Sequence, residues 1–288
     1  MKDLGRVGSY IGIDINYDID KNKMQLSQKR YIESLAKKYK LENAKLYTTP
    51  METALKLEPA ERVNEEIQYR SLIGELLYIS TGTRPDIAFS INYLSRFQSA
   101  YNETHFKYAM RVLKYLYLTK EFKLIYEKTY ERKILECLVD ADWAGDITDR
   151  KSTTGYLIKF YNNVIHWKTN KQKSVTKSST ESEYVALSSA VTEVIFIKGI
   201  IEEVFKITFR EPINIYEDNS GAIVIAKNGN LSKKSKYIEV QYHNVHEFYE
   251  KGIIKIVKIA TEENTADILT KPLNKIKFLK HREALKLN

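Results

Sequence analysis

Four acidic residues in the second half of the chain stand where predicted strands end or predicted helices begin: Asp140, Glu183, Asp218 and Asp267. Carboxylates are seldom buried without partners, so several that converge at the end of a sheet indicate bound cations. A set of hard oxygen ligands with few histidines favours magnesium or manganese over zinc. Taken singly, each acid could instead cap or support the first turn of a helix. The four together predict a divalent-metal site.

Two of these acids have an acidic neighbour that competes for the same role. Asp140 and Asp142 end the same predicted strand, and a separation of two residues puts both side chains on one face, so spacing does not choose between them. Glu181 and Glu183 lie at the start of a helix, where the same separation makes the side chains diverge. Glu183 shares its helix face with small residues such as Ala186, which would allow close packing. This pattern favours Glu183 over Glu181.

The elements that must position these acids follow from hydrophobic periodicity. Strands joined by hairpins are expected first, followed by helices that alternate with single strands, which describes a mixed sheet flanked by helices and an α/β fold. The expected strands cover residues 134–139, 154–161, 164–168, 213–216 and 253–259. The expected helices cover residues 179–205, a short stretch after residue 218, and residues 239–250, with two helical segments closing the chain.

The first part of the sequence has a different pattern. Residues 10–15 and 23–26 flank a polar turn, as in a hairpin, and Ser27 is placed to cap the helix that follows. Three helical segments come next, the second of which opens with Pro85-Asp86. The chain turns polar and charged around residues 126–132. We therefore predict two domains, residues 1–128 and residues 129–288.

Composition narrows the class of protein. The formal charge of +9 over 288 residues suggests a polyanionic partner, although solubility alone would also explain it. Cys137 is the single cysteine, which excludes an internal disulfide and cysteine-based zinc sites. The longest apolar run, residues 194–201, is far shorter than the roughly 20 residues of a membrane span. We expect an intracellular protein that does not partner a membrane.

A series of motifs resembles, in order, the ribonuclease H domain of copia-type retroelements. The motifs are Asp140-Ala-Asp-Trp-Ala-Gly-Asp146, Arg150-Lys-Ser-Thr-Thr-Gly-Tyr156, Lys171-Gln-Lys-Ser174, Ser178-Ser-Thr-Glu-Ser-Glu-Tyr-Val-Ala186, Tyr216-Glu-Asp-Asn219 and Ala266-Asp-Ile-Leu-Thr-Lys-Pro-Leu273. The first domain is similar to the segment just upstream in the same Pol polyproteins, which is the end of the reverse transcriptase with its thumb and connection. Its motifs include Thr49-Pro-Met51, Thr83-Arg-Pro-Asp-Ile87 and Leu94-Ser-Arg-Phe97.

The resemblance implies a ribonuclease H that cuts the RNA strand of an RNA–DNA hybrid with two magnesium or manganese ions. It assigns catalysis and metal binding to Asp140, Glu183, Asp218 and Asp267, with Asp140 shared by both ions and Asp267 nearer the attacking water. The implied partners are the hybrid and the remainder of a Pol polyprotein. The implied location is a cytoplasmic virus-like particle if the element is active, with the nucleus as an alternative.

Basic residues near the predicted site are candidates for contacts with nucleic-acid phosphates, because hybrids are recognised largely through shape and backbone. They are Lys168, Lys171, Lys173 and Lys177 before the Glu183 helix, and Lys233, Lys234 and Lys236 after the Asp218 helix. Each of them could equally be a solvated surface charge. His243 and His246 lie three residues apart on a predicted helix, but no third soft ligand accompanies them, so we do not predict a metal pair there.

A departure from the family pattern leaves alternatives open. The chain contains no Asp-Asp dipeptide, which a retroelement polymerase needs, so polymerisation is not expected and the chain is interpreted as starting after that motif. A catalytically silent remnant or an adopted nucleic-acid-binding module is the main alternative, and an acid-rich metal-binding structural protein is a third. A first domain without its polymerase is also expected to expose apolar helix stripes.

Overall fold

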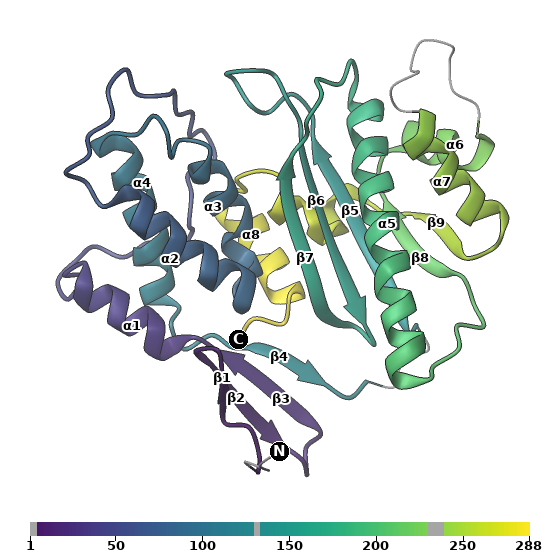
Figure 1. The fold of residues 1–288 in the computed structure, drawn as a ribbon, viewed down its shortest axis with the longest axis horizontal. Coiled ribbons are helices and arrows are strands. Elements are labelled where there is room, and N and C mark those ends of the chain that lie inside the picture. Colours follow the sequence, from purple (N-terminus) through teal and green to yellow (C-terminus); the bar gives the residue numbers. More distant parts are fainter. Residues whose placement is uncertain (1–4, 130–132, 230–238) are drawn as a thin grey trace. The chain divides into compact units, whose positions relative to one another are not determined.

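The computed structural model describes residues 5–129, 133–229 and 239–288, with the backbone alone for residues 239–244. The chain divides into two compact units, one formed by residues 1–128 with 272–288 and the other by residues 129–271. The first unit contains a small sheet and helices, and the second is built on a larger sheet (Figure 1).

The sheet of the first unit has four antiparallel strands in the order β1-β2-β3-β4. Their bounds are β1 Ser9–Tyr10, β2 Ile13–Asp18, β3 Lys23–Ser27 and β4 Leu124–Glu127. The β2–β3 hairpin is the one expected from the sequence, and Asn22 in its turn has the positive φ that asparagine tolerates. Strand β4 was not predicted, because it is short and its last residues fall in the polar stretch around residues 126–132 that we interpreted as the domain boundary.

The helices of the first unit are α1 Lys29–Lys38, α2 Tyr69–Gly82, the short η1 Pro85–Ile87, α3 Ala88–Ser95, α4 Glu103–Leu118 and α8 Lys275–Ala284. The predicted cap of α1 is wrong by one position. Gln28 is the N-cap residue, and Ser27 accepts a hydrogen bond from the Lys29 N–H from just outside the helix. Asn102 caps α4 in a reciprocal capping box with His105.

A buried ion pair lies in the core of the first unit. The Arg84 guanidinium donates two hydrogen bonds to Asp86, at 2.9 and 2.7 Å, and two more to Thr119. The Tyr115 hydroxyl donates to the same Asp86 carboxylate. Because both charges are buried and fully hydrogen bonded, removing one partner would leave the other uncompensated.

The end of the chain packs with the first unit. The backbone of Lys123 and that of Asn288 exchange hydrogen bonds of 2.9 and 3.3 Å, and the ring of Phe278 meets that of Tyr115 edge-on at 5.7 Å. The sequence assigns residues 129–288 to the second domain, whereas by compactness residues 272–288 join residues 1–128. The physical reason is that α8 and the last residues complete the apolar core and the β4 edge of the first unit.

The second unit has a five-stranded mixed sheet in the order β7-β6-β5-β8-β9. Its strands are β5 Leu135–Asp142, β6 Thr153–Phe160, β7 Asn163–Lys171, β8 Ile213–Glu217 and β9 Ile254–Lys258. Strands β5, β6 and β7 are antiparallel neighbours, while β8 is parallel to both β5 and β9. Tyr161 and Asn162, both with positive φ, form the tight β6–β7 turn.

The helices of the second unit are α5 Ser179–Phe205, α6 Ser220–Asn228 and α7 Glu239–Glu250, followed by the short η2 Thr261–Glu263 and η3 Thr265–Leu269. Alternate residues of β5 and β8 form one apolar core with α5, α6 and α7, among them Cys137, Val139 and Ile215. The α/β fold with a mixed sheet and flanking helices, expected from the sequence, is therefore confirmed (Figure 1).

Helix α5 is long and apolar enough to cross a membrane by length and composition alone, and half of that apolar stretch is buried inside the structure. Its small residues Ala186 and Ala190 are fully buried in the core of the second unit. The buried half of this stretch belongs to the apolar core of the second unit.

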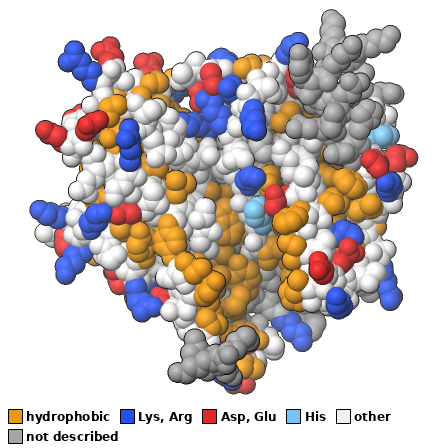
Figure 2. Space-filling view, in the orientation of Figure 1, with side chains coloured by type: hydrophobic (Ala, Val, Ile, Leu, Met, Phe, Trp, Pro, Cys, Tyr) orange, Lys and Arg blue, Asp and Glu red, His pale blue; other side chains and the backbone are white. Residues whose placement is uncertain are grey.

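Exposed apolar side chains lie elsewhere than the sequence led us to expect. The predicted apolar stripe of α2 is buried, with Leu72, Ile73 and Leu76 fully enclosed, so the expectation that helix stripes of the first domain are exposed is wrong for this helix. Figure 2 shows hydrophobic side chains gathered along the later part of α5, where Phe196 and Val204 are each 63% exposed. The apolar face of α2 is covered by other parts of the protein. The sequence pattern of one helix does not reveal which segment will cover it.

Candidate metal centre

Three carboxylates meet at the carboxyl ends of the two central strands of the second unit. Asp140 lies near the end of β5, Glu183 lies in the second turn of α5, and Asp218 directly follows β8. Each residue offers one ligand oxygen, and these three atoms lie within 4.8 Å of one another. Strands β5 and β8 are parallel neighbours, so their carboxyl ends bring Asp140 and Asp218 together, and α5 adds Glu183.

Neither competing acid belongs to the three-carboxylate cluster. Asp142 packs against the loop after β5, where a Cβ at Gly145 would stand 1.9 Å from an Asp142 carboxylate oxygen. Glu181 is exposed in the first turn of α5 and accepts a hydrogen bond from the Lys177 N–H at 2.7 Å. The structure therefore gathers Asp140 and Glu183, and not their neighbours, into the three-carboxylate cluster.

Asp267 reaches the same region from η3. It is 1% exposed, and its carboxylate lies 2.8 Å from the ammonium of Lys271. The same ammonium is 3.8 Å from the Asp140 carboxylate, which also accepts a hydrogen bond from the Thr270 hydroxyl. Asp267 thus meets Asp140 through Lys271 and not as a fourth member of the tight cluster.

Capping does not account for Asp218 or Asp267, because asparagines occupy the cap positions. Asn219 accepts a hydrogen bond from the Ala222 N–H at 3.0 Å and caps α6. Asn264 accepts from the Ala266 N–H and caps η3, and its amide also donates to the Val139 carbonyl of β5 at 2.8 Å. The Asn264 bridge fixes η3 against β5 and leaves the Asp267 carboxylate for another role.

Burial among like charges raises the pKa of several carboxyl groups. Burial raises the pKa of Asp140 to about 7, the Lys271 ammonium opposes this rise, and the charge of Asp267 adds to it. Burial also raises the pKa of Glu183, to about 11, with further contributions from the charges of Asp140 and Glu217. A bound cation would lower these pKa values, since positive charge favours the ionised form of a carboxyl group.

Glu217 is a site-adjacent acid that sequence reasoning missed. It is fully buried at the end of β8; one carboxylate oxygen accepts a hydrogen bond from the Asn219 N–H at 2.8 Å, and the other has no partner among the described residues. Burial raises its pKa well above the ordinary value. The alternation of β8 gives the available signal, because Ile213, Ile215 and Glu217 share the buried face.

The donor set fits a magnesium or manganese ion. All three ligand groups of the cluster are carboxylates, which are the oxygen donors that these ions prefer. One carboxylate oxygen of Glu183 is buried without a hydrogen-bond partner among the described residues. A buried acceptor of this kind costs free energy unless a cation or a proton satisfies it. Asp140, Glu183 and Asp218 are thus suited to hold a divalent ion.

The candidate phosphate-binding lysines differ in their surroundings. Lys168, Lys173 and Lys177 are exposed, whereas Lys171 is half-buried and lies 2.7 Å from Asp146 and 2.9 Å from Asp149. Lys171 therefore holds the β5–β6 loop. The other three candidates, Lys233, Lys234 and Lys236, lie outside the described residues.

The structure describes the side chain of only one of the two histidines of α7. The side chain of His243 lies outside the described residues. The His246 ring contacts the Ala226 carbonyl at 3.1 Å and packs against Gly229, at the end of α6. His246 is thus occupied in joining α7 to α6.

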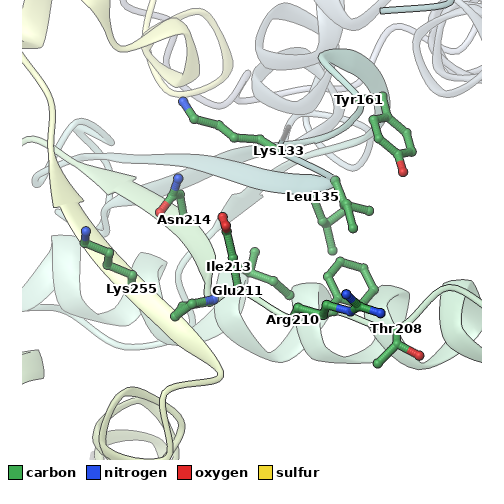
Figure 3. Close-up of a pocket in the computed structure, with 12 residues that line it drawn as sticks. Lys133, Leu135, Tyr161, Thr208, Arg210, Glu211, Ile213, Asn214 and Lys255 are labelled. Atoms are coloured by element: carbon green, nitrogen blue, oxygen red, sulfur yellow. The ribbon is translucent and has the colours of Figure 1, made fainter. Parts of the chain in front are cut away.

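A pocket of about 630 Å³ lies at the opposite ends of the same strands. Figure 3 shows Lys133 and Leu135 at the start of β5, Arg210 and Glu211 in the loop before β8, and Lys255 on β9. The metal-binding candidates lie at the carboxyl ends of β5 and β8, so this pocket is separate from them.

Sheet order, strand directions and the acids at the carboxyl ends of β5 and β8 together define a ribonuclease H-like fold. The sequence comparisons identify the family. The chain is 35% identical over 286 residues to the Retrovirus-related Pol polyprotein from transposon TNT 1-94 of Nicotiana tabacum, covering 96% of this chain and 21% of that protein. It is 35% identical over 257 residues to the corresponding RE1 polyprotein of Arabidopsis thaliana, covering 88% and 17%. The chain belongs to the copia-type retrotransposon Pol polyproteins.

The chain spans about a fifth of the length of these curated relatives. No family model matches it. Among solved structures it is similar to LC11-RNase H1, isolated from compost by a metagenomic approach, with 15% identity and a TM-score of 0.37 over 48% of this chain and 93% of that one.

Proposed function

We propose that this chain is a metal-dependent ribonuclease H, which hydrolyses the RNA strand of an RNA–DNA hybrid as part of a retrotransposon Pol polyprotein. The observation that carries the proposal is the convergence of Asp140, Glu183 and Asp218 within 4.8 Å, with Asp267 beside them. Membership of the copia-type Pol family supplies the polyprotein context. No polymerisation is expected, because the sequence contains no pair of consecutive aspartates.

The position of each carboxylate would determine which cation it binds. Asp140 faces both the Glu183–Asp218 cluster and the Asp267–Lys271 pair, so it is the residue that can serve two cation positions. Magnesium or manganese ions bound there would activate a water molecule and stabilise the leaving 3′-oxygen of an in-line RNA hydrolysis. Thr270 donates to Asp140 and thereby fixes the orientation of the shared carboxylate.

The proposed substrate is a hybrid and not a single strand, because ribonuclease H chemistry at such a site requires 2′-hydroxyls presented in a wide minor groove. The exposed lysines that precede α5, Lys173 and Lys177, would contact phosphates of the bound strand. Lys168 on β7 is exposed as well and extends the same basic set.

The test is a cleavage assay with the complete chain. An end-labelled RNA annealed to DNA is incubated with Mg²⁺ or Mn²⁺ and compared with the same RNA alone and with an RNA duplex. We expect cleavage of the hybrid only. The Asp218→Asn variant should lose at least about a hundredfold in rate, because a lost metal ligand removes several kcal/mol of transition-state stabilisation.

The matched control is Glu181→Gln, which changes an exposed carboxylate on the same helix as Glu183 but outside the cluster. It should cut at nearly the wild-type rate. If the wild-type chain and the Asp218→Asn variant cut hybrid equally, or if neither cuts it, the ribonuclease assignment is wrong.

A further inference from the structure

Lys271 places a positive charge inside the carboxylate site. Its ammonium lies 2.8 Å from Asp267 and 3.8 Å from Asp140, and its side chain is one-third exposed. The lysine is therefore a charged partner of both acids.

Asp140 separates two distinct cation environments. On one side, Asp140, Glu183 and Asp218 bring three carboxylate oxygens within 4.8 Å of one another, and no cation of the described chain is paired with Glu183. On the other side, Asp140 and Asp267 flank an ammonium at ion-pair distance. One environment thus has three oxygen donors and an unsatisfied acceptor, and the other already contains a positive charge.

We propose that Lys271 is a tethered cation that fills the second cation position, so that the chain without substrate binds one divalent ion and not two. This inference rests on the proposed function and concerns which residues hold the cations of that site. An ammonium that bridges two carboxylates would have to leave before a divalent ion could bind both. The single ion of the resting chain is held by Asp140, Glu183 and Asp218.

Charge supports the same division. The four carboxylates carry four negative charges when ionised, and Lys271 with one divalent ion supplies three positive charges. A second divalent ion with Lys271 still in place would crowd two cations between Asp140 and Asp267. A nucleic-acid phosphate would bring the negative charge that such a second ion requires.

The experiment counts Mn²⁺ bound to the complete, substrate-free chain by electron paramagnetic resonance at saturating metal. The wild-type chain should bind one ion. Lys271→Met, which keeps the length of the side chain and removes its charge, should bind two ions whose spins couple because they share Asp140. Two ions in the wild-type chain, or a single ion in Lys271→Met, would overturn the proposal.

Two further variants keep the test decisive if Lys271→Met does not fold. Asp267→Asn should still bind one Mn²⁺ with affinity within about threefold of wild type, while Asp218→Asn should bind at least about tenfold more weakly. Equal losses in both variants would contradict the division into two positions. Lys258→Met is the matched lysine control, because Lys258 bonds the Asp218 carbonyl and Ser220 and no carboxylate of the site. It should bind one ion.

The ribonuclease proposal, tested by cleavage, and the Lys271 proposal, tested by the number of bound ions, can fail independently. A chain that binds one Mn²⁺ but does not cut the hybrid would refute the proposed ribonuclease and leave the lysine position supported. A chain that cuts the hybrid and binds two ions without substrate would refute the lysine position alone.

Discussion

Gly155 pairs with Asp140 across β6 and β5, at the place where η3 crosses β6. A Cβ added at Gly155 would stand 2.5 Å from Thr270 Cγ2 and 2.8 Å from Leu269 Cβ. Gly155→Ala should therefore push η3, and Asp267 with it, away from the site. We expect a loss of about 1–3 kcal/mol of unfolding free energy, as in other overpacked cores, together with slower hybrid cleavage, measured by urea unfolding and the labelled-RNA assay.

Gly199 provides the opposite control. It lies inside α5, and a Cβ there would meet no atom within 4 Å. Gly199→Ala should raise the unfolding free energy by about 0.5–1 kcal/mol because alanine is the better helix former, and cleavage should be unchanged. If both glycine variants behave alike, the contact between Gly155 and η3 is not the reason that glycine is needed.

The buried Glu217 predicts a specific pH dependence of stability without metal. Its pKa is higher in the folded chain than the unfolded value of about 4.3, so stability falls as the pH rises from the unfolded toward the folded value. Glu217→Gln removes this loss while keeping the oxygen that accepts from Asn219. Its advantage over wild type should be near zero at pH 4 and grow by at most about 1.4 kcal/mol per pH unit.

This advantage is measured by urea unfolding in the presence of a chelator at pH 5 and pH 8. The exposed Glu211→Gln serves as the control and should not gain stability with pH. An equal difference between Glu217→Gln and wild type at both pH values would show that Glu217 is not protonated on folding.

The exposed lysines before α5 predict a salt-dependent contribution to hybrid binding. Replacing Lys173 and Lys177 by alanine should weaken binding and lower the slope of log affinity against log salt by about 2, one for each lost phosphate contact. Binding is followed by fluorescence anisotropy in a non-cleaving Asp218→Asn background. The control removes the same charge at the end of α1 and in the turn after it, as Lys37 and Lys40 to alanine. If the slope falls equally in both double variants, Lys173 and Lys177 do not contact phosphates.

The ion pair of Arg84 and Asp86 predicts a large stability effect in the first unit. Arg84→Met leaves the Asp86 carboxylate buried without its two guanidinium hydrogen bonds, which should cost about 3–5 kcal/mol. Arg30→Met breaks the exposed pair with Asp14 and should cost less than about 1 kcal/mol. Calorimetric unfolding compares the two variants, and similar losses in both would mean that burial of the pair does not matter.

Periodicity was a reliable guide wherever an element buries a regular face. The long helix at residues 179–205 and the helix at residues 239–250 were predicted with the bounds that the structure has. Small residues on one face of α5 pointed to Glu183, and the structure places it with Asp140 and Asp218. In these elements local pattern and tertiary packing select the same side chains.

Other features depend on contacts between distant parts of the chain, which no local pattern encodes. Spacing could not separate Asp140 from Asp142, since the choice is made by the packing of Asp142 against Gly145. Lys271 and Glu217 gain their significance from acids that are distant in sequence. Strand β4 forms only because β3 lies beside it.

The return of residues 272–288 to the first unit has a consequence for cleavage of the backbone. Peptide-bond scission between residues 128 and 129 would yield two polypeptides, and the second would carry α8, whose Phe278 and Arg282 are partners of Tyr115 in the first. The two polypeptides would remain a noncovalent complex until the contacts of α8 with residues 1–128 were broken. Freeing the ribonuclease H-like unit requires a second scission, just after Lys271.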